Sequence, residues 1–453
     1  MKVLATLDRT TRAEEETSPA GSPSAHRYTY AAVFLFTLIL YFRPHEAYPG
    51  IPLLAGIAFW SAAITLLVYI CSQLNYSGSL TFLSPEVKCA LLLAVLGLLS
   101  VPIARDPTLA WNTFSDPFIK VMAVFIVLAN VLTNEQRIRG LMWLGIGIGG
   151  YLSYQTYELY NQGVFSVEGY RVTPDFGGMF GNPNDMSIHL VMFIPISFTL
   201  ALASRTFLGK LVFYVAAGIM AVAISLTQSR SGFIGLVAIV LALIWKLGRG
   251  RRVKAMLAAS ICTVLFLAFA PGNYGVRVLS IFDFSLDATG SASQRREALD
   301  RSILVTLRNP QGVGIGNSSL FGLRDLETHN AYTQISSELG WIALGGYVVF
   351  LVYPMRRLSK IEKEMSDTGT KTMHYYMIVG THAAIIGYMV SSFFASVAYL
   401  WYVYYPVAFA IGLRGIYEAR DSSTARGEAE QATAGQEQRA RNLSKRRRYR
   451  IPR

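Results

Sequence analysis

The chain has few charged residues for its length of 453 residues. Only 15% of the residues are Asp, Glu, Lys or Arg, whereas 52% are hydrophobic. The apolar residues form long blocks, and a run of about 20 is enough to cross the roughly 30 Å hydrocarbon core of a bilayer. The composition therefore predicts a polytopic membrane protein and argues against a set of soluble domains.

Cysteine is also scarce. The three cysteines, Cys71, Cys89 and Cys262, lie in or beside hydrophobic blocks. They have neither the spacing of metal ligands nor that of a disulfide framework. We expect them to be small apolar packing residues, and we expect neither a metal site nor a cofactor.

Motifs that bind nucleotides or metals are missing from the sequence. It has no Asp-x-Asp pair on the side predicted to face outward, no Walker loop, no His/Cys cluster and no Gly-x-Ser-x-Gly elbow. A nucleotide sugar or ATP is therefore not expected as a donor. An enzyme on the outer face would need a substrate already activated in the membrane, and a lipid diphosphate-linked sugar is the obvious candidate.

The net charge of +13 does not indicate a nucleic-acid partner. Much of it lies in short loops and in the end of the chain, 441-RNLSKRRRYRIPR-453, where it sets topology and meets anionic membrane lipids. Residues 1–27 are polar and predict a disordered cytoplasmic tail. Residues 419–453 predict a second, basic and disordered cytoplasmic tail, which leaves 28–418 as the membrane domain.

The apolar blocks predict an all-α integral membrane protein with about twelve transmembrane helices. The basic short loops fall on one side if this count is right, and that side should be cytoplasmic. The opposite, outer side then receives a long loop, 271–334. The approximate spans are 28–42, 51–71, 87–103, 117–132, 139–154, 185–202, 208–227, 231–246, 254–270, 335–354, 373–391 and 394–414.

An arginine stands at the rim of one predicted span, in 225-SLTQSRSGFIGL-236. Snorkelling to the headgroups would explain Arg230. However, Gln228 and the flanking serines supply hydrogen-bonding groups where contact with lipid would favour none. The planar fork of an arginine is also suited to clamping a diphosphate. These features favour ligand holding by Arg230 and Gln228.

A histidine and an asparagine precede another predicted span, in 327-ETHNAYTQISSELG-340. Taken alone, His329 followed by Asn330 would be a surface pair. Its position at the start of a span fits a general base, because a neutral imidazole can accept a proton from a hydroxyl near pH 7. Glu327 or Glu338 would then orient His329, and the sequence does not choose between them.

Three further segments on the same side contribute polar residues. The segment 293–308 reads as an amphipathic helix, on which Arg295 and Arg296 either bind phosphate or are solvated. The run 312-GVGIGN-317 fits turn chemistry better than a phosphate loop. In 181-GNPND-185 we expect a turn that caps a helix, with Asn184 as a less favoured ligand contact. All of these segments face one compartment and could converge on one cavity.

The sequence resembles the O-antigen ligase and polymerase family of bacterial envelope proteins. The resemblance is carried by 224-ISLTQSRSGFIGL-236, by 295-RREAL-299 with 309-NPQGVGIGN-317, and by 328-THNAYTQISSELGWIAL-344, in the family's order. It extends over roughly 180–355. The early 41-YFRPHEAYPGIP-52 is similar to the N-terminal region of O-glycosylation ligases associated with exosortase systems.

This resemblance implies an inverting, metal-independent glycosyltransferase with a fold related to the GT-C class. It would move a glycan from undecaprenyl diphosphate to a lipid A core, glycan or protein acceptor at the periplasmic face of the bacterial inner membrane. The residues matching Arg230 and His329 are the family's essential pair, and Arg295 matches a further arginine. Leu299 stands where the family commonly has an aromatic residue, which leaves the register of Arg295 against Arg296 open.

Other functions remain open at this stage. A polymerase or a ligase acting on protein would share these motifs. A transporter of lipid-linked glycans would instead predict charged or broken helices near the bilayer midplane. A structural membrane protein would not explain why the polar residues gather on one side.

Overall fold

The computed structural model describes residues 26–44, 50–51, 54, 56–165, 167–174, 180–248, 250–272, 274–281, 291–321, 327–424 and 426. Apart from one isolated bridge between Val167 and Arg171, the regular structure of this part is helical. The prediction of an all-α architecture is therefore confirmed for these residues. Most of both predicted tails and residues 45–49 and 52 of the early segment 41–52 lie outside the described residues.

Eight helices of the described chain are long and apolar enough to cross a membrane, which supports a multi-pass membrane protein. Helices also overlap the other four predicted intervals, so the number of twelve spans stays a prediction. The last interval is partly wrong, because residues 395–403 are not helical and a helix covers 404–424 instead. The other helices are α2 (Arg27–Phe42), α4 (Ile57–Ser77), α5 (Pro85–Ser100), α6 (Pro107–Thr113), η2 (Phe114–Phe118), α7 (Ile119–Val131), α8 (Glu135–Asn161), α9 (Pro183–Ala203), α10 (Phe207–Leu226), α11 (Arg230–Leu247), α12 (Arg252–Phe269), α13 (Tyr274–Leu279), α14 (Ser291–Arg308), η4 (Ser318–Phe321), α15 (Ala331–Asp367), α16 (Met373–Ser391) and η6 (Ser392–Phe394).

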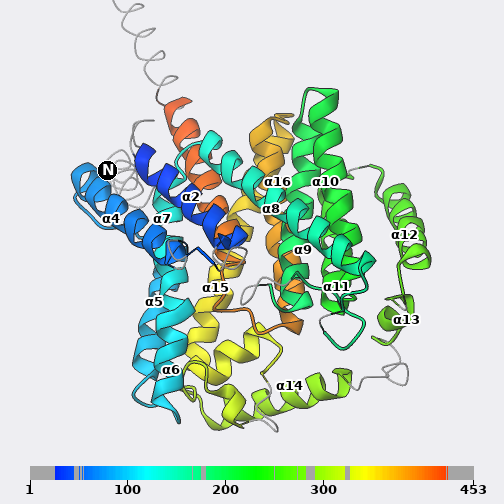
Figure 1. Cartoon of the computed structure of the whole chain (residues 1–453). Coiled ribbons are helices and arrows are strands. Elements are labelled where there is room, and N and C mark those ends of the chain that lie inside the picture. Colours follow the sequence, from blue (N-terminus) through cyan, green and yellow to red (C-terminus); the bar gives the residue numbers. More distant parts are fainter. Residues whose placement is uncertain are drawn as a thin grey trace, which may run out of the picture.

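Helix α9 lies inside the bundle, and small residues bring α11 and α16 close together beside it (Figure 1). A Cβ atom on Gly235 would lie 2.1 Å from Ser391 Oγ, and one on Gly387 would lie 2.6 Å from Ile239 Cγ2. Small residues allow such close approach between membrane helices. The packing therefore fixes the first turn of α11 beside the segment that follows α16.

The helices that begin near the predicted site residues carry side-chain caps. Asn182 caps α9 and Asn330 caps α15, each through its side-chain oxygen. Ser229 caps α11 by accepting a hydrogen bond of 3.2 Å from the backbone N–H of Gly232. Such caps satisfy the first N–H groups of a helix. The prediction that 181-GNPND-185 caps a helix is confirmed.

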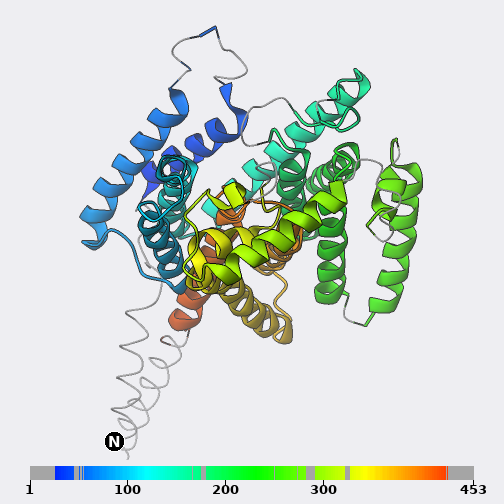
Figure 2. The same cartoon turned by 90° about the horizontal axis from the view of Figure 1, so that it is seen from below.

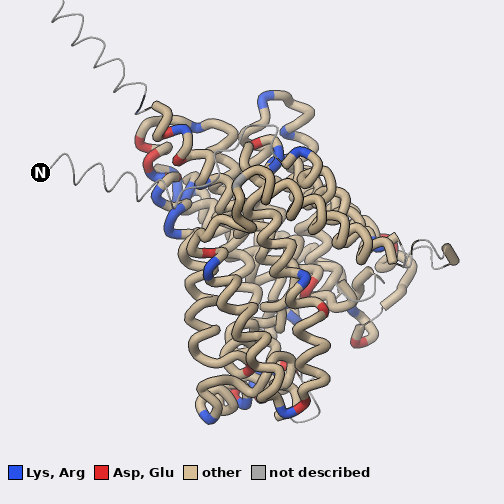
Figure 3. Tube along the Cα trace, turned by 90° about the vertical axis from the view of Figure 1, so that its left-hand side faces the viewer, with Lys and Arg blue, Asp and Glu red and all other residues tan. Residues whose placement is uncertain are grey.

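Contacts gather the basic loops at one end of the bundle. The Tyr30 hydroxyl donates to the Arg137 carbonyl at 3.1 Å, and Arg420 pairs with Glu135 at 2.8 Å. Arg357 pairs with Glu418 in the last helix. Charged residues are most frequent toward the two ends, and a smaller number lie at intermediate height (Figure 3). This distribution is the one expected of helices that cross a bilayer.

Helix α14 lies across the opposite end of the bundle (Figures 1 and 2). It spans Ser291–Arg308, so the predicted amphipathic helix is confirmed. The side chains of Ile303, Leu304 and Leu307 are exposed on it. A helix of this kind fits the interface between the membrane and water.

The glycine run after α14 packs against a break in α15. Gly340 has φ 84° and ψ −179°, values that only glycine adopts readily. The Val313 N–H donates to the Ser337 carbonyl at 2.9 Å, and the Gly314 N–H donates to the Glu338 carbonyl at 3.0 Å. The structure thus supports the prediction of turn chemistry in 312–317.

The cysteines depart from expectation. Cys71 on α4 and Cys262 on α12 are exposed, and Cys89 is half-buried. The prediction of small apolar packing residues is supported for Cys89, which packs against the core, and not for Cys71 and Cys262. All three are free thiols.

Candidate active site

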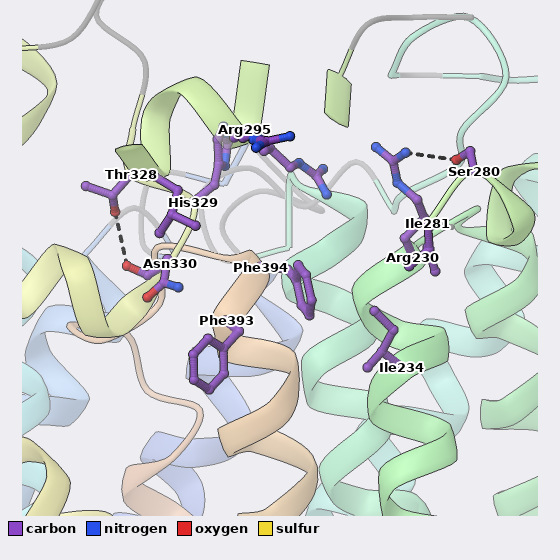
Figure 4. A pocket seen from close by; sticks show the side chains of 12 residues that line it. Arg230, Ile234, Ser280, Ile281, Arg295, Thr328, His329, Asn330, Phe393 and Phe394 are labelled. Carbon is purple, nitrogen blue, oxygen red and sulfur yellow. Dashed lines mark hydrogen bonds between the residues drawn. The ribbon is translucent and has the colours of Figure 1, made fainter. Parts of the chain in front are cut away.

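A cavity of about 310 Å³ opens where α11, α14 and the segments flanking α15 and α16 meet. We call it the arginine cavity. Figure 4 shows Arg230 across from Arg295 and His329, with Phe393 and Phe394 below them in the view. It is lined by Arg230, Ile234, Ser280, Ile281, Arg295, Arg296, Leu299, Thr328, His329, Asn330, Phe393 and Phe394.

Most of the predicted site residues meet at this cavity. Arg230, Arg295, Arg296, His329 and Asn330 all line it, although they are far apart in the sequence. Two predicted residues do not. Asn184 lines a neighbouring cavity. Gln228 lines neither, and its side-chain amide donates a hydrogen bond of 2.9 Å to the Pro271 carbonyl.

Arg230 is held at the first turn of α11. Its side chain is only 6% exposed, and a guanidinium nitrogen donates to Ser280 Oγ at 3.0 Å. Ser280 Oγ in turn donates to the Arg277 carbonyl at 2.7 Å. Because Arg230 is buried beside the arginine cavity and hydrogen-bonded within the protein, snorkelling does not explain its position.

A second cavity, of about 200 Å³, adjoins the first, and we call it the polar cavity. Arg295 and His329 line both cavities, so they form the wall between them. The polar cavity is lined by Val167, Glu168, Arg171, Gly181, Asn182, Pro183, Asn184, Gln294, Arg295 and His329.

A buried arginine that the sequence did not single out organises the polar cavity. Arg171 is 2% exposed and donates to Asn184 Oδ1 at 2.9 Å and to the Thr227 carbonyl at 3.1 Å. Ser229 Oγ donates to the same Asn184 oxygen at 2.9 Å. This chain of hydrogen bonds connects the polar cavity with the cap of α11.

Glu168 bridges two arginines at the rim of the polar cavity. Its carboxylate lies 3.7 Å from Arg171 and 3.2 Å from Arg277. Arg277 also donates to the Gln228 carbonyl at 2.8 Å. The sequence did not single out these three residues, and its one signal was an acidic residue among basic residues in loops on the same side.

The arginines make the site strongly positive. Burial lowers the pKa of Arg295 to about 10, and the nearby charges of Arg230 and Arg171 add to this effect. Burial likewise lowers the pKa of Arg171 to about 10, although Glu168 opposes the shift. Cations crowded in a partly buried cavity are suited to an anionic ligand.

The imidazole of His329 is neutral at pH 7. Burial, followed by the charge of Arg295, lowers the pKa of His329 to about 4. Of the two glutamates that the sequence offered as its partner, Glu338 does not contact it, because the Glu338 carboxylate accepts hydrogen bonds from the Gly316 N–H at 2.7 Å and from Ser318 Oγ at 2.5 Å. Glu327 is exposed and lines neither cavity.

Strained backbone gathers at this site. The described chain has five non-glycine residues with positive φ. Three of them are Glu168 at 53°, Gln228 at 57° and His329 at 48°. Strain of this kind costs about 1–3 kcal/mol per residue and clusters at functional sites.

The fold and these cavities define a multi-pass helical membrane protein with an arginine-rich site at one end. Residues 215–348 match the family model described as O-antigen ligase. The resemblance to the O-antigen ligase family is thereby confirmed over this segment, which includes Arg230, Arg295 and His329 and indicates a glycan-transferring ligase. No curated protein matches the chain.

Proposed function

We propose that the protein is an inverting, metal-independent glycosyltransferase that takes a glycan from undecaprenyl diphosphate and passes it to a lipid A core, glycan or protein acceptor. Its membrane is the bacterial inner membrane, and its site faces the periplasm. One observation carries this proposal: Arg230, Arg295 and His329 line a single cavity within the segment that matches O-antigen ligase.

The arginine cavity is suited to the donor. Arg230 and Arg295 would hold the diphosphate and stabilise the negative charge that develops on it as it leaves. The apolar side chains of Ile234, Phe393 and Phe394 line the same cavity and would contact the first isoprenoid units. Arg296 is exposed, whereas Arg295 is half-buried and lines both cavities. We therefore assign the second phosphate-binding arginine to Arg295.

The transfer step assigns a role to His329. The acceptor hydroxyl oxygen forms a bond to the anomeric carbon while the bond from that carbon to the diphosphate oxygen breaks. The electron pair of the broken bond passes to the diphosphate, and the hydroxyl proton passes to the neutral imidazole of His329. Attack opposite the leaving group inverts the anomeric centre.

Purified protein in detergent, supplied with an undecaprenyl diphosphate-linked glycan and a panel of acceptors, tests the proposal. We expect Arg230→Ala and His329→Ala to fold normally and to reduce release of undecaprenyl diphosphate by about 10²–10³-fold. The matched control is Arg301→Ala, which removes an exposed arginine paired with Glu297 outside both cavities. Turnover of the two site variants at the parent's rate would overturn the proposal, and the size of the product separates ligase from polymerase.

A further inference from the structure

We propose that the polar cavity binds the sugar of the acceptor whose hydroxyl is glycosylated, and that Glu168 is its principal ligand. This inference rests on the proposed function and adds to it a second substrate subsite with its own specificity residues. It starts from the contrast between two adjoining cavities and from the two residues that they share.

The two cavities differ in chemistry. The arginine cavity combines cations with apolar side chains such as Ile234, Ile281 and Phe394, which suits a lipid diphosphate. The polar cavity also has two arginines, but it combines them with the Glu168 carboxylate and with the amide side chains of Asn182, Asn184 and Gln294. Amides and carboxylates are suited to hydroxyl groups, because together they donate and accept hydrogen bonds. A carbohydrate is the ligand that matches this wall.

The two residues shared by the cavities determine where each substrate lies. Arg295 would hold the diphosphate from one side, and His329 is exposed to both cavities. An in-line displacement needs the attacking oxygen on the side of the anomeric carbon opposite the diphosphate. With the diphosphate in the arginine cavity, the attacking hydroxyl would therefore lie on the side of the polar cavity, beside His329.

Glu168 is positioned to accept hydrogen bonds from a sugar. Arg171 and Arg277 each pair with one oxygen of its carboxylate, and the Glu168 side chain keeps 27% exposure. Tyr170 also donates a hydrogen bond to it. Its backbone has φ 53°, so the turn directs this carboxylate at a cost in strain. A fixed carboxylate forms strong, charge-assisted hydrogen bonds with hydroxyl groups.

Asn184 adds a hydrogen-bond donor to the lining of the polar cavity. Its side-chain oxygen accepts from both Arg171 and Ser229, which fixes the orientation of the amide. Its amide nitrogen makes no hydrogen bond to the residues that the structure describes. Because the same oxygen supports the cap of α11, a change at Asn184 would also disturb Arg230. Glu168 and Gln294 are therefore the cleaner test positions.

The first test measures the KM for each substrate separately, with the acceptor that gives the fastest transfer. We expect Glu168→Gln to raise the acceptor KM about tenfold, because a neutral hydrogen bond to the sugar replaces a stronger, charge-assisted one. Gln294→Ala should raise it by a smaller factor, and the donor KM should change little in either variant. The matched control is Glu297→Gln, since Glu297 is an exposed carboxylate paired with Arg301 and lines neither of the two cavities.

The second test uses methyl glycosides of glucose, galactose and N-acetylglucosamine as soluble probes. We expect at least one of them to compete with the acceptor, and Glu168→Gln to weaken that competition about tenfold. Competition with the lipid-linked donor, or no competition by any of the three, would overturn the assignment. A rise in the donor KM in place of the acceptor KM would also overturn it and would place the donor's first sugar in this cavity.

The two proposals fail separately. If the parent protein releases no undecaprenyl diphosphate, the proposed function itself is wrong. If the parent transfers the glycan while Glu168→Gln and Gln294→Ala behave like Glu297→Gln, the glycosyltransferase stands and the acceptor subsite is wrong.

Discussion

The imidazole of His329 lies beside a guanidinium group that disfavours a second positive charge. Burial and Arg295 lower the pKa of His329 from its ordinary value of 6.5 to about 4. A base with so low a pKa is weak, but it is unprotonated throughout the neutral range. A bound diphosphate would neutralise part of the arginine charge and raise this pKa while the substrate is present.

The pH profile should show both effects. Since the neutral form of His329 is the active one, we expect kcat/KM, which reports the free enzyme, to stay level from about pH 8 to about pH 5 and to fall below about pH 4. We expect the acid limb of kcat to lie at a higher pH, because it reports the complex with the diphosphate. Stopped assays across this range measure both profiles. An acid limb of kcat/KM at about pH 6.5 or above would contradict the assignment.

Site residues could be predicted where their neighbours in the sequence reveal them. Site residues whose role depends on a partner remote in the sequence could not. Arg230 stood out because its neighbours are polar beside a long apolar run. Arg171 and Arg277 look like ordinary loop residues, and their importance appears only when the fold brings Glu168 between them. Glu338 was one of two candidate partners for His329, but its carboxylate accepts hydrogen bonds from Gly316 and Ser318 in and after the glycine run.

The break in α15 joins the glycine run to the helix that follows His329. A Cβ atom on Gly340 would lie 2.5 Å from the Pro310 carbonyl oxygen, and one on Gly312 would lie 2.3 Å from the Glu338 carbonyl oxygen. The two backbones therefore lie closer together than any side chain allows. This junction fixes how α14 and α15 meet behind the site.

Substituting the glycine at the break should destabilise the protein. Gly340→Ala would add both a collision and a backbone conformation that costs about 1–3 kcal/mol in residues with a side chain. We expect a lower midpoint of thermal unfolding in detergent. Gly345→Ala is the matched control in the same helix, because a Cβ atom on Gly345 would meet nothing within 4 Å. Equal midpoints for the two variants would refute this account of the break.

An ion pair also links helices α11 and α15 near their C-terminal ends. The Lys246 ammonium pairs with Glu362 and contacts His382 Nδ1 at 2.8 Å, which joins α11, α15 and α16. The side chains of Lys246 and Glu362 are only 8% and 12% exposed. Removing one member of a buried pair leaves the other charge uncompensated.

Two neighbouring glutamates of α15 allow a matched comparison. We expect Glu362→Ala to lower the free energy of unfolding by about 3 kcal/mol, because it leaves Lys246 buried without its partner. Glu364→Ala removes a 44% exposed partner of Lys360, and it should cost less than about 1 kcal/mol. Unfolding in denaturant measures both values. A cost for Glu362→Ala no larger than that for Glu364→Ala would show that the cluster does not hold the helices together.

At the scale of the whole molecule, the apolar helices differ in how deeply they lie inside the bundle. The central window of α9 is 83% buried, whereas that of α12 has no buried residues. Hydropathy alone predicted both as spans, but it could not tell which one forms the core, because both sequences are equally apolar. Burial depends on neighbours that are remote in the sequence.

Labelling of single cysteines tests the orientation. In a variant with Cys71, Cys89 and Cys262 replaced by alanine, we expect Ser318→Cys to react with a membrane-impermeant maleimide in intact cells. Arg205→Cys should react only after the membrane is permeabilised, because the positive-inside rule places its loop in the cytoplasm. The reverse pattern would invert the protein in the membrane and would exclude a periplasmic site.

A more stable version of this protein should not be sought by relaxing its most strained backbone. Replacement of Glu168, Gln228 or His329 by glycine would relieve a positive φ, and a design guided by stability alone would favour it. Each replacement would also remove a side chain or a support of the two cavities. Engineering for heat tolerance is therefore better directed at positions far from these turns, where added stability need not be exchanged for turnover.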